Sequence, residues 1–221
     1  MVIYENYMKY QDFRNKFQNA PIIFSKNIIL GQSKKQIIRN QLARWNKNGL
    51  LVELRRGAYL LNDNDRKVHV SNPYLANQLY SPSYISLEYA LNFYGLIPER
   101  VNDVTSITTR KTLSFSNNTG NFSYRHVNPS VYRGFTSVND KQGLSFLIAD
   151  PEKALMDFCY LNLGLFSGNY KDIFLESYRL QNMESLNIKK ILYYAELFNI
   201  KKLMKVADVL CGIICQERRS E

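Results

Sequence analysis

The side chains best suited to directional polar contacts are concentrated between Gly31 and Leu61, in the stretch GQSKKQIIRNQLARWNKNGLLVELRRGAYLL. On a period of 3.6 residues Ile38, Leu42 and Trp45 fall on one face, which predicts a helix with that face in the core. The other side carries Ser33, Lys34, Lys35, Gln36, Arg39, Asn40, Arg44 and Lys47, with Ala43 among them. Asn, Gln and Arg form paired hydrogen bonds with base edges in the major groove, and Ala leaves room for close approach. The pattern therefore predicts a DNA-recognition helix.

Two further guanidinium groups follow that helix closely. The apolar segments Leu50–Leu54 and Ala58–Leu61 are predicted to pair as a hairpin, with Arg55 and Arg56 projecting from its tip. Such a tip can hold phosphates or enter the minor groove, where the negative potential favours Arg. A short helix, a turn, a basic helix and a basic-tipped hairpin follow one another in the order of a winged helix-turn-helix. The tight Asn48-Gly49 joint would fix the angle between hairpin and helix.

The charge of the chain is distributed unevenly. The 221 residues carry a formal net charge of +10, and residues 1 to 68 hold +8 of it, with 13 Lys and Arg against 5 Asp and Glu. Exposed Lys and Arg are usually only solvated, but this density favours a polyanionic partner, either nucleic acid or an anionic membrane surface. No stretch approaches ~18 consecutive apolar residues, and the N-terminus lacks a signal-peptide pattern. We therefore expect a cytoplasmic protein that binds DNA and no membrane.

A second group of reactive side chains, Glu152, Lys153 and Asp157, invites a nuclease or phosphotransfer interpretation. Acidic residues can hold Mg²⁺ while a Lys stabilises developing charge. No glycine-rich phosphate loop, metal-ligand spacing or nucleophile-base pair accompanies them in the sequence. Helix capping explains the pattern better, with Asp150 as N-cap, Pro151 at the first position and Glu152 near the positive end of the dipole. We expect no catalytic residue and no cofactor.

Two cysteines, Cys211 and Cys215, stand four residues apart on a predicted helix. That spacing could place two thiolates on one metal ion. The only histidines, His69 and His126, lie far away in the sequence. We therefore expect buried apolar thiols and no metal site.

The stretch NDNDRKVHVSNPY, residues 62 to 74, is polar and rich in turn formers, and it predicts a boundary between two domains. The first domain, residues 1–68, should contain an amphipathic helix over Tyr4 to Phe17. A short helix capped by Ser25 and stopped by Gly31 should follow, and then the recognition helix. A Ser33-x-x-Gln36 capping box should start the recognition helix, and Asn48-Gly49 should end it.

The second domain, residues 69–221, has a mixed pattern. SLEYALNFYGL predicts a helix with Ser86 as N-cap and Leu87, Ala90, Leu91 and Tyr94 in the core. VTSITTRKTLSF and FSYRHV read as strands about the NNTG turn, LSFLI as another strand, and Ile188 to Phe198 and Lys201 to Arg218 as helices. The expected fold class is α+β: a winged helix-turn-helix domain followed by a mixed α/β domain with a mainly antiparallel sheet and C-terminal helices.

Four segments read together resemble the AbiEi-type antitoxins, the regulatory half of type IV toxin-antitoxin systems that act in phage abortive infection. The segments are the Gly31 to Leu61 stretch already quoted, SYISLEYALNFYGLIPE, TSITTRKT and DPEKALMDFCYL. The resemblance spans about Ser25 to Leu161. Its first segment is common to many winged regulators, whereas the ordered set of the later three is much more specific. The chain departs from the family at Tyr89, where a small residue is frequent, and at Tyr94, where many relatives have His.

The resemblance implies a cytoplasmic antitoxin that also represses its own operon by binding inverted repeats of double-stranded operator DNA. Its functional partner would be a nucleotidyltransferase toxin, counteracted without a stable complex. A monomer in solution with cooperative DNA binding is implied as well. The Ser33 to Lys47 helix and the Arg55 to Tyr59 wing would be the DNA-contacting parts.

Two alternatives stand beside this interpretation. One is a nucleic-acid-processing enzyme whose nuclease-like C-terminal domain is delivered by a winged helix. The other is an ordinary ligand-responsive winged-helix transcriptional regulator. A neighbouring gene for a nucleotidyltransferase-like protein would favour the antitoxin over both.

Overall fold

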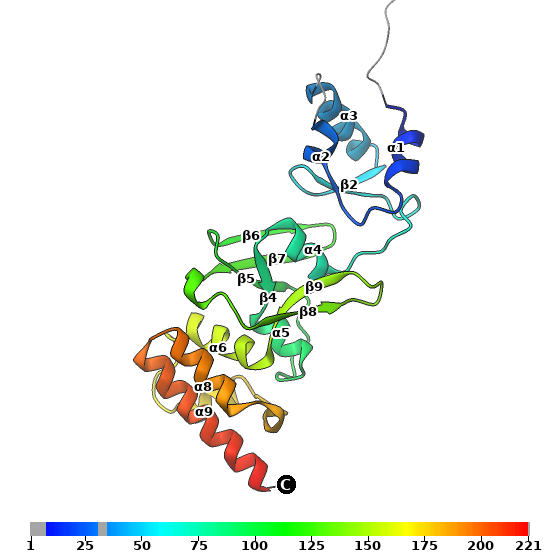
Figure 1. Ribbon diagram of the computed structural model, residues 1–221. Coiled ribbons are helices and arrows are strands. Elements are labelled where there is room, and N and C mark those ends of the chain that lie inside the picture. The colour runs from blue at the N-terminus through cyan, green and yellow to red at the C-terminus, as the bar shows by residue number, and fades with distance from the viewer. Residues whose placement is uncertain (1–7, 31–34, 221) are drawn as a thin grey trace, which may run out of the picture. The chain divides into compact units, whose positions relative to one another are not determined.

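The computed structural model describes residues 8–30 and 35–220, and it divides the chain into two compact units. Unit 1 comprises residues 1–71 with 116–119, and unit 2 comprises residues 72–115 with 120–221 (Figure 1). Both units contain helices and strands, so the fold class is α+β. In the part of the chain that the structure describes, no helix is long and apolar enough to cross a membrane.

Unit 1 combines helices with a small sheet. Its elements are α1 (Tyr10–Phe17), β1 (Ile23–Phe24), α2 (Ser25–Ile29), α3 (Lys35–Lys47), β2 (Leu51–Arg55) and β3 (Ala58–Leu61). The strands are antiparallel in the order β1-β3-β2, and β1 is an addition to the expected hairpin. Residues 4 to 7 of the expected first helix lie outside the described residues, as does Gly31.

The core of unit 1 forms around Trp45 of α3. The Trp45 ring lies 4.8 Å from that of Phe13 and 5.4 Å from that of Tyr10, measured between centroids. Leu42 is buried beside it, and Ile38 is half-buried. The helical period therefore predicted the inner face of α3 correctly.

The joint between α3 and β2 also follows the sequence. The helix ends at Lys47, and Gly49 has a positive φ of 72°. The backbone N–H of Gly49 donates to Asn46, and that of Leu50 donates to Trp45, so the last helical carbonyls are satisfied. The Asn48-Gly49 stop is confirmed.

Unit 2 contains a six-stranded sheet in the order β6-β7-β5-β4-β9-β8. The strands are β4 (Ser83–Ile85), β5 (Val104–Thr108), β6 (Leu113–Asn117), β7 (Gly120–His126), β8 (Phe135–Asn139) and β9 (Ser145–Ala149). β4 pairs with β5 and β8 with β9 in antiparallel fashion, whereas β4 with β9 and β5 with β7 are parallel. The sheet is mainly antiparallel but mixed.

The expectation of one strand over VTSITTRKTLSF is wrong, because the chain bends between β5 and β6. The hydroxyl of Thr108 accepts a hydrogen bond from the backbone N–H of Arg110 and donates one to Pro82 O. A Thr side chain that bonds two residues ahead favours a turn over a continuous ladder. The single expected strand therefore becomes two strands, and β5 and β6 lie on opposite sides of β7.

The elements of unit 2 that were not expected include α4 (Asn72–Leu79), β4 and β8. The first part of α4 falls in the stretch predicted as a boundary, where Asn72-Pro73 reads as a turn. Pro is also well tolerated in the first turn of a helix, and here α4 continues and packs against β4, β5 and β9. The tertiary contacts decide between two local structures that the dipeptide permits equally.

The remaining helices of unit 2 pack on one another, with α5 and α6 also contacting strands of the sheet. They are α5 (Leu87–Phe93), α6 (Pro151–Leu161), α7 (Tyr170–Asp172), α8 (Ile188–Leu197) and α9 (Lys201–Ser220), with 3-10 turns at Pro129–Val131 and Met183–Ser185 and a π-helical turn at Ile173–Ser177. α6 contacts α5, α8, α9 and β9 (Figure 1). The two C-terminal helices expected from the sequence are confirmed.

Candidate nucleic-acid interface

The outward face of α3 carries the candidate DNA-contacting residues. Lys35, Gln36, Arg39, Asn40, Ala43, Arg44 and Lys47 are all exposed. The helix contains no acidic residue. Ser33 and Lys34 lie outside the described residues, so the Ser33 half of the expected capping box does too. A helix that buries Leu42 and Trp45 thus presents four cations and two carboxamides on its other side.

The two carboxamides on this face contact each other. Nε2 of Gln36 donates to Oδ1 of Asn40 at 2.9 Å, one helical turn on. Ile37 stands beside them with 40% of its surface exposed. The sequence pattern did not single out Ile37, although its place next to Gln36 already put it off the buried stripe.

The hairpin differs in one respect from the expected tip. Arg55 is the last residue of β2, where it pairs with Ala58 and is half-buried. Arg56 is exposed and forms the turn with Gly57, whose φ is 82°. The turn is held from outside the hairpin, because Ser25 N donates to Gly57 O at 2.8 Å. One guanidinium group is therefore carried by the turn and the other by the strand, since the turn has only two residues.

A side chain that the sequence pattern missed connects α3 to the hairpin. Oδ1 of Asn46 accepts a hydrogen bond of 3.1 Å from the backbone N–H of Glu53 in β2. Oε1 of Glu53 in turn accepts from the backbone N–H of Gly57 at 3.4 Å. Helix, strand and turn are thereby joined by polar contacts as well as by the short joint.

Acidic residues of unit 1 are engaged in internal contacts. Asp65 accepts a hydrogen bond from the Tyr10 hydroxyl at 2.7 Å and pairs with Arg14 at 3.4 Å, and Asp63 pairs with Arg66. Burial, followed by the hydrogen bond to Asp65, raises the pKa of Tyr10 well above its usual value. The Tyr10 phenol therefore stays neutral at physiological pH. Asp63 and Asp65 are occupied by these contacts within unit 1, and α3 itself contains no acidic residue.

In unit 2, the capping explanation is wrong for Lys153 and Asp157, which form a buried ion pair. Both residues are 0% exposed. Asp157 also accepts hydrogen bonds of 2.9 Å from the hydroxyls of Tyr84 and Ser86. Ser86 precedes α5 as expected, but its hydroxyl makes this contact and no cap. The ammonium of Lys153 lies 4.8 Å from the ring centroid of Phe198, so the cation is enclosed by protein.

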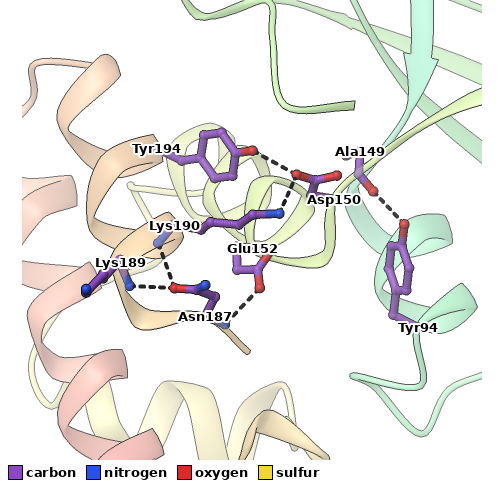
Figure 2. A network of polar contacts seen from close by, with 8 residues as sticks. All are labelled: Tyr94, Ala149, Asp150, Glu152, Asn187, Lys189, Lys190 and Tyr194. Atoms are coloured by element: carbon purple, nitrogen blue, oxygen red, sulfur yellow. Dashed lines mark hydrogen bonds and ion pairs between the residues drawn. The ribbon is translucent and has the colours of Figure 1, made fainter. Parts of the chain in front are cut away.

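The start of α6 belongs to a second polar network (Figure 2). Asp150 is the N-cap residue with Pro151 following, but its carboxylate makes no cap and instead accepts from Lys190 at 3.0 Å and Tyr194 at 2.9 Å. Buried Glu152 accepts from the backbone N–H of Asn187 at 2.8 Å. The carboxylates expected to stabilise their own helix thus bind α8 and its N-cap, because α8 packs against that end of α6.

The pKa values of Tyr94, Tyr194 and Lys190 in this network are raised, which favours their protonated forms. Burial, with Asp150 and Glu152 adding to it, raises the pKa of Tyr94 to about 12, and its hydroxyl donates to Ala149 O at 2.9 Å. Burial and the bond to Asp150 raise the pKa of Tyr194, and the same carboxylate raises the pKa of Lys190. These groups act as fixed donors that hold helices to the sheet.

The expected burial of both C-terminal cysteines is half right. Cys211 is buried, whereas Cys215 is exposed. Burial raises the pKa of the Cys211 thiol to about 11, with Asp208 adding to the rise, so the thiol stays protonated near neutral pH. Within residues 8–30 and 35–220 no group of three or more His, Cys, Asp or Glu side chains could hold a metal ion.

No protein-family model matches the chain, and no curated protein matches it either. The arrangement of side chains therefore carries the functional argument, together with the resemblance of the quoted segments.

Proposed function

We propose that this chain is a non-enzymatic, double-stranded-DNA-binding repressor, with α3 as the helix that enters the major groove. The observation that carries the proposal is the composition of the outward face of α3. This face presents four cations and two carboxamides, all of them exposed, and the helix contains no acidic residue. Cations neutralise phosphates and carboxamides read base edges.

The order of elements in unit 1 supports a winged helix-turn-helix. The sequence of elements is α1, β1, α2, α3, β2, β3, and the sheet order is β1-β3-β2. In that architecture the hairpin after the recognition helix is the wing. Exposed Arg56 in its turn would then contact phosphate or the minor groove.

The antitoxin part of the proposal rests on the resemblance to the AbiEi-type antitoxins. By that resemblance the chain represses its own operon at inverted repeats, as a monomer that binds cooperatively. It counteracts a nucleotidyltransferase toxin without forming a stable complex. Unit 2, with the three most specific segments, would carry this second activity in the cytoplasm.

The environment of Lys153 and Asp157 disfavours the nuclease alternative. Each is fully buried and paired with the other, and the remaining oxygen of Asp157 accepts from Tyr84 and Ser86. Neither side chain reaches solvent to bind Mg²⁺ or substrate. Support for a binding protein is correspondingly stronger than support for an enzyme.

The salt dependence of DNA binding tests the proposal. The full chain is titrated into a labelled duplex taken from upstream of its own coding sequence, between about 50 and 200 mM salt. If about 6 phosphates are contacted, log K should fall against log salt with a slope near −5. A reporter driven by the same DNA should be repressed. A flat salt response, or no binding even at low salt, would contradict the proposal.

A further inference from the structure

The outward face of α3 separates its charges from its amides. Gln36, Asn40, Ala43 and Lys47 follow one another at intervals of four, three and four residues, which is a line along the helix opposite Leu42 and Trp45. Lys35 and Arg39 lie on one side of this line, and Arg44 lies on the other. A helix in the major groove brings its central line to the base edges and its flanks toward the phosphates. Three uncharged residues, Gln36, Asn40 and Ala43, are thus at positions that face the base edges, and Lys47 ends the line.

The contact between Gln36 and Asn40 holds the side-chain amide of Asn40 in one orientation. Nε2 of Gln36 donates to Oδ1 of Asn40 at 2.9 Å, and this bond leaves the Nδ2 donors of Asn40 unused. Oδ1 keeps a second lone pair. Asn40 therefore offers one donor and one acceptor side by side, which match N7 and the N6 amino group of adenine. Guanine presents two acceptors there and leaves the Asn oxygen without a partner.

Ile37 supplies an exposed apolar side chain beside this line, on the same flank as Arg44. It is 40% exposed although it is a β-branched residue among cations and amides. The C5 methyl group of thymine is the apolar feature that base pairs offer in the major groove. The small side chain of Ala43, exposed on the central line, permits the backbone to come close.

We infer that each operator half-site presents an adenine to Asn40 and a thymine methyl group to Ile37, so that α3 selects A·T base pairs at the centre of its footprint. This inference rests on the proposed function, in which α3 enters the major groove. Gln36 acts as a positioning residue for the Asn40 amide.

Single-atom changes in the DNA test the inference. The full chain first selects binding sites from a random-sequence duplex library. In the selected duplex, 7-deazaadenine then replaces each adenine in turn and removes N7, and uracil replaces each thymine and removes the methyl group. One 7-deazaadenine should weaken wild-type binding about tenfold. One uracil should weaken it about fourfold.

Two variants assign each loss to a side chain. Asn40→Ala should bind the selected duplex more weakly and no longer respond to 7-deazaadenine at that position. Ile37→Ala should lose the response to uracil and keep the response to 7-deazaadenine. Asn102→Ala and Leu165→Ala, at exposed positions of unit 2, are matched controls that should respond as wild type does. Both sites on α3 are exposed, so folding should be retained, which thermal unfolding checks.

The possible outcomes distinguish a failure of this inference from a failure of the proposed DNA-binding function. Selected sites with G·C pairs at the positions coupled to Asn40 would overturn the inference and leave DNA binding intact. Equal responses of wild type and both variants to every base change would overturn it as well. Salt-dependent binding with equal affinity for all duplexes would also overturn the inference and leave DNA binding intact. Absence of binding to any duplex at low salt would remove the proposed function, and the inference with it.

Discussion

At the scale of single residues, the Asp157 carboxylate joins three separate groups of unit 2. It pairs with Lys153 and accepts from Tyr84 on β4 and from Ser86 before α5. Burial raises the pKa of this carboxyl, while the Lys153 charge and the three hydrogen bonds oppose the rise. A buried ion pair adds little net stability, but removal of one partner leaves an uncompensated charge in the core.

Asp157→Asn should therefore lower the free energy of unfolding by about 3 to 5 kcal/mol, because Lys153 loses its counter-charge. Urea unfolding followed by circular dichroism measures the change. Asp208→Asn makes the same substitution at an exposed site of α9 and should stay within about 0.5 kcal/mol of wild type. Equal urea midpoints for Asp157→Asn and wild type would show that the folded protein tolerates buried Lys153 without its counter-charge.

At the scale of elements, Gly134 shows how closely α8 packs on the turn before β8. Gly134 has a φ of 83°, and a Cβ atom there would lie 2.6 Å from Cε1 of Tyr194. The hydroxyl of the same tyrosine donates to Asp150, and Asp150 N donates to Gly134 O at 2.9 Å. Neither the ring nor the backbone can shift without breaking one of these contacts.

Gly134→Ala should cost roughly 2 to 4 kcal/mol of unfolding free energy, the sum of strain at positive φ and displacement of the Tyr194 ring. Gly143→Ala is the matched control, since Gly143 has a φ of 80° and nothing within 4 Å of an added Cβ. It should cost only about 1 kcal/mol from strain. Thermal unfolding of both variants gives the difference, and a Gly134→Ala cost no larger than the control's would mean that Tyr194 moves freely.

The helices and strands also show which parts of the fold the sequence can predict. Periodicity and stop signals predicted the inner face of α3, its end at Asn48-Gly49 and the pair α8 and α9, because these depend on local pattern. β4 has three residues and β8 lies at a sheet edge with mostly exposed side chains, so neither gives a clear alternation.

The buried pair on α6 was misjudged because Lys153 and Asp157, four residues apart, look like a surface pair. A signal was present, however: Ala154, Leu155, Met156, Phe158 and Cys159 are apolar around the whole helix, which is typical of a buried element. Which carboxylate bonds to which helix, as in Figure 2, depends on tertiary packing and has no sequence pattern. On α3, the pattern gave the outward residues but no means of finding the Gln36 to Asn40 contact.

At the scale of the whole molecule, charge is segregated between the two units. Residues 1 to 68 carry +8 of the net charge of +10. DNA affinity should therefore depend on unit 1, whereas the three most specific segments of the family resemblance lie in unit 2. The two activities of the proposed antitoxin should be separable by substitution.

Lys35→Ala with Arg39→Ala, on one flank of α3, should make the slope of log K against log salt less steep by about 2, since each phosphate contact contributes close to 1. In cells that express the toxin gene from an independent promoter, this variant should lose repression of a reporter and still restore growth. Lys201→Ala with Lys205→Ala removes the same charge from exposed positions of α9 and should keep both activities. A folded, abundant α3 variant that fails to restore growth would show that DNA binding and neutralisation are one activity.

The buried contacts of Asp157 also limit how the sequence of this protein can diverge in evolution. A single codon change at Asp157 or Lys153 leaves a buried charge behind, at a cost comparable with much of the stability of an ordinary domain. Lineages should therefore exchange the two residues together, and positions 153 and 157 should covary among relatives. The outward positions of α3 carry no such constraint, because each can be replaced at little cost to folding. Under the proposed function, the DNA sequence that α3 recognises can thus change one step at a time while the body of the protein stays the same.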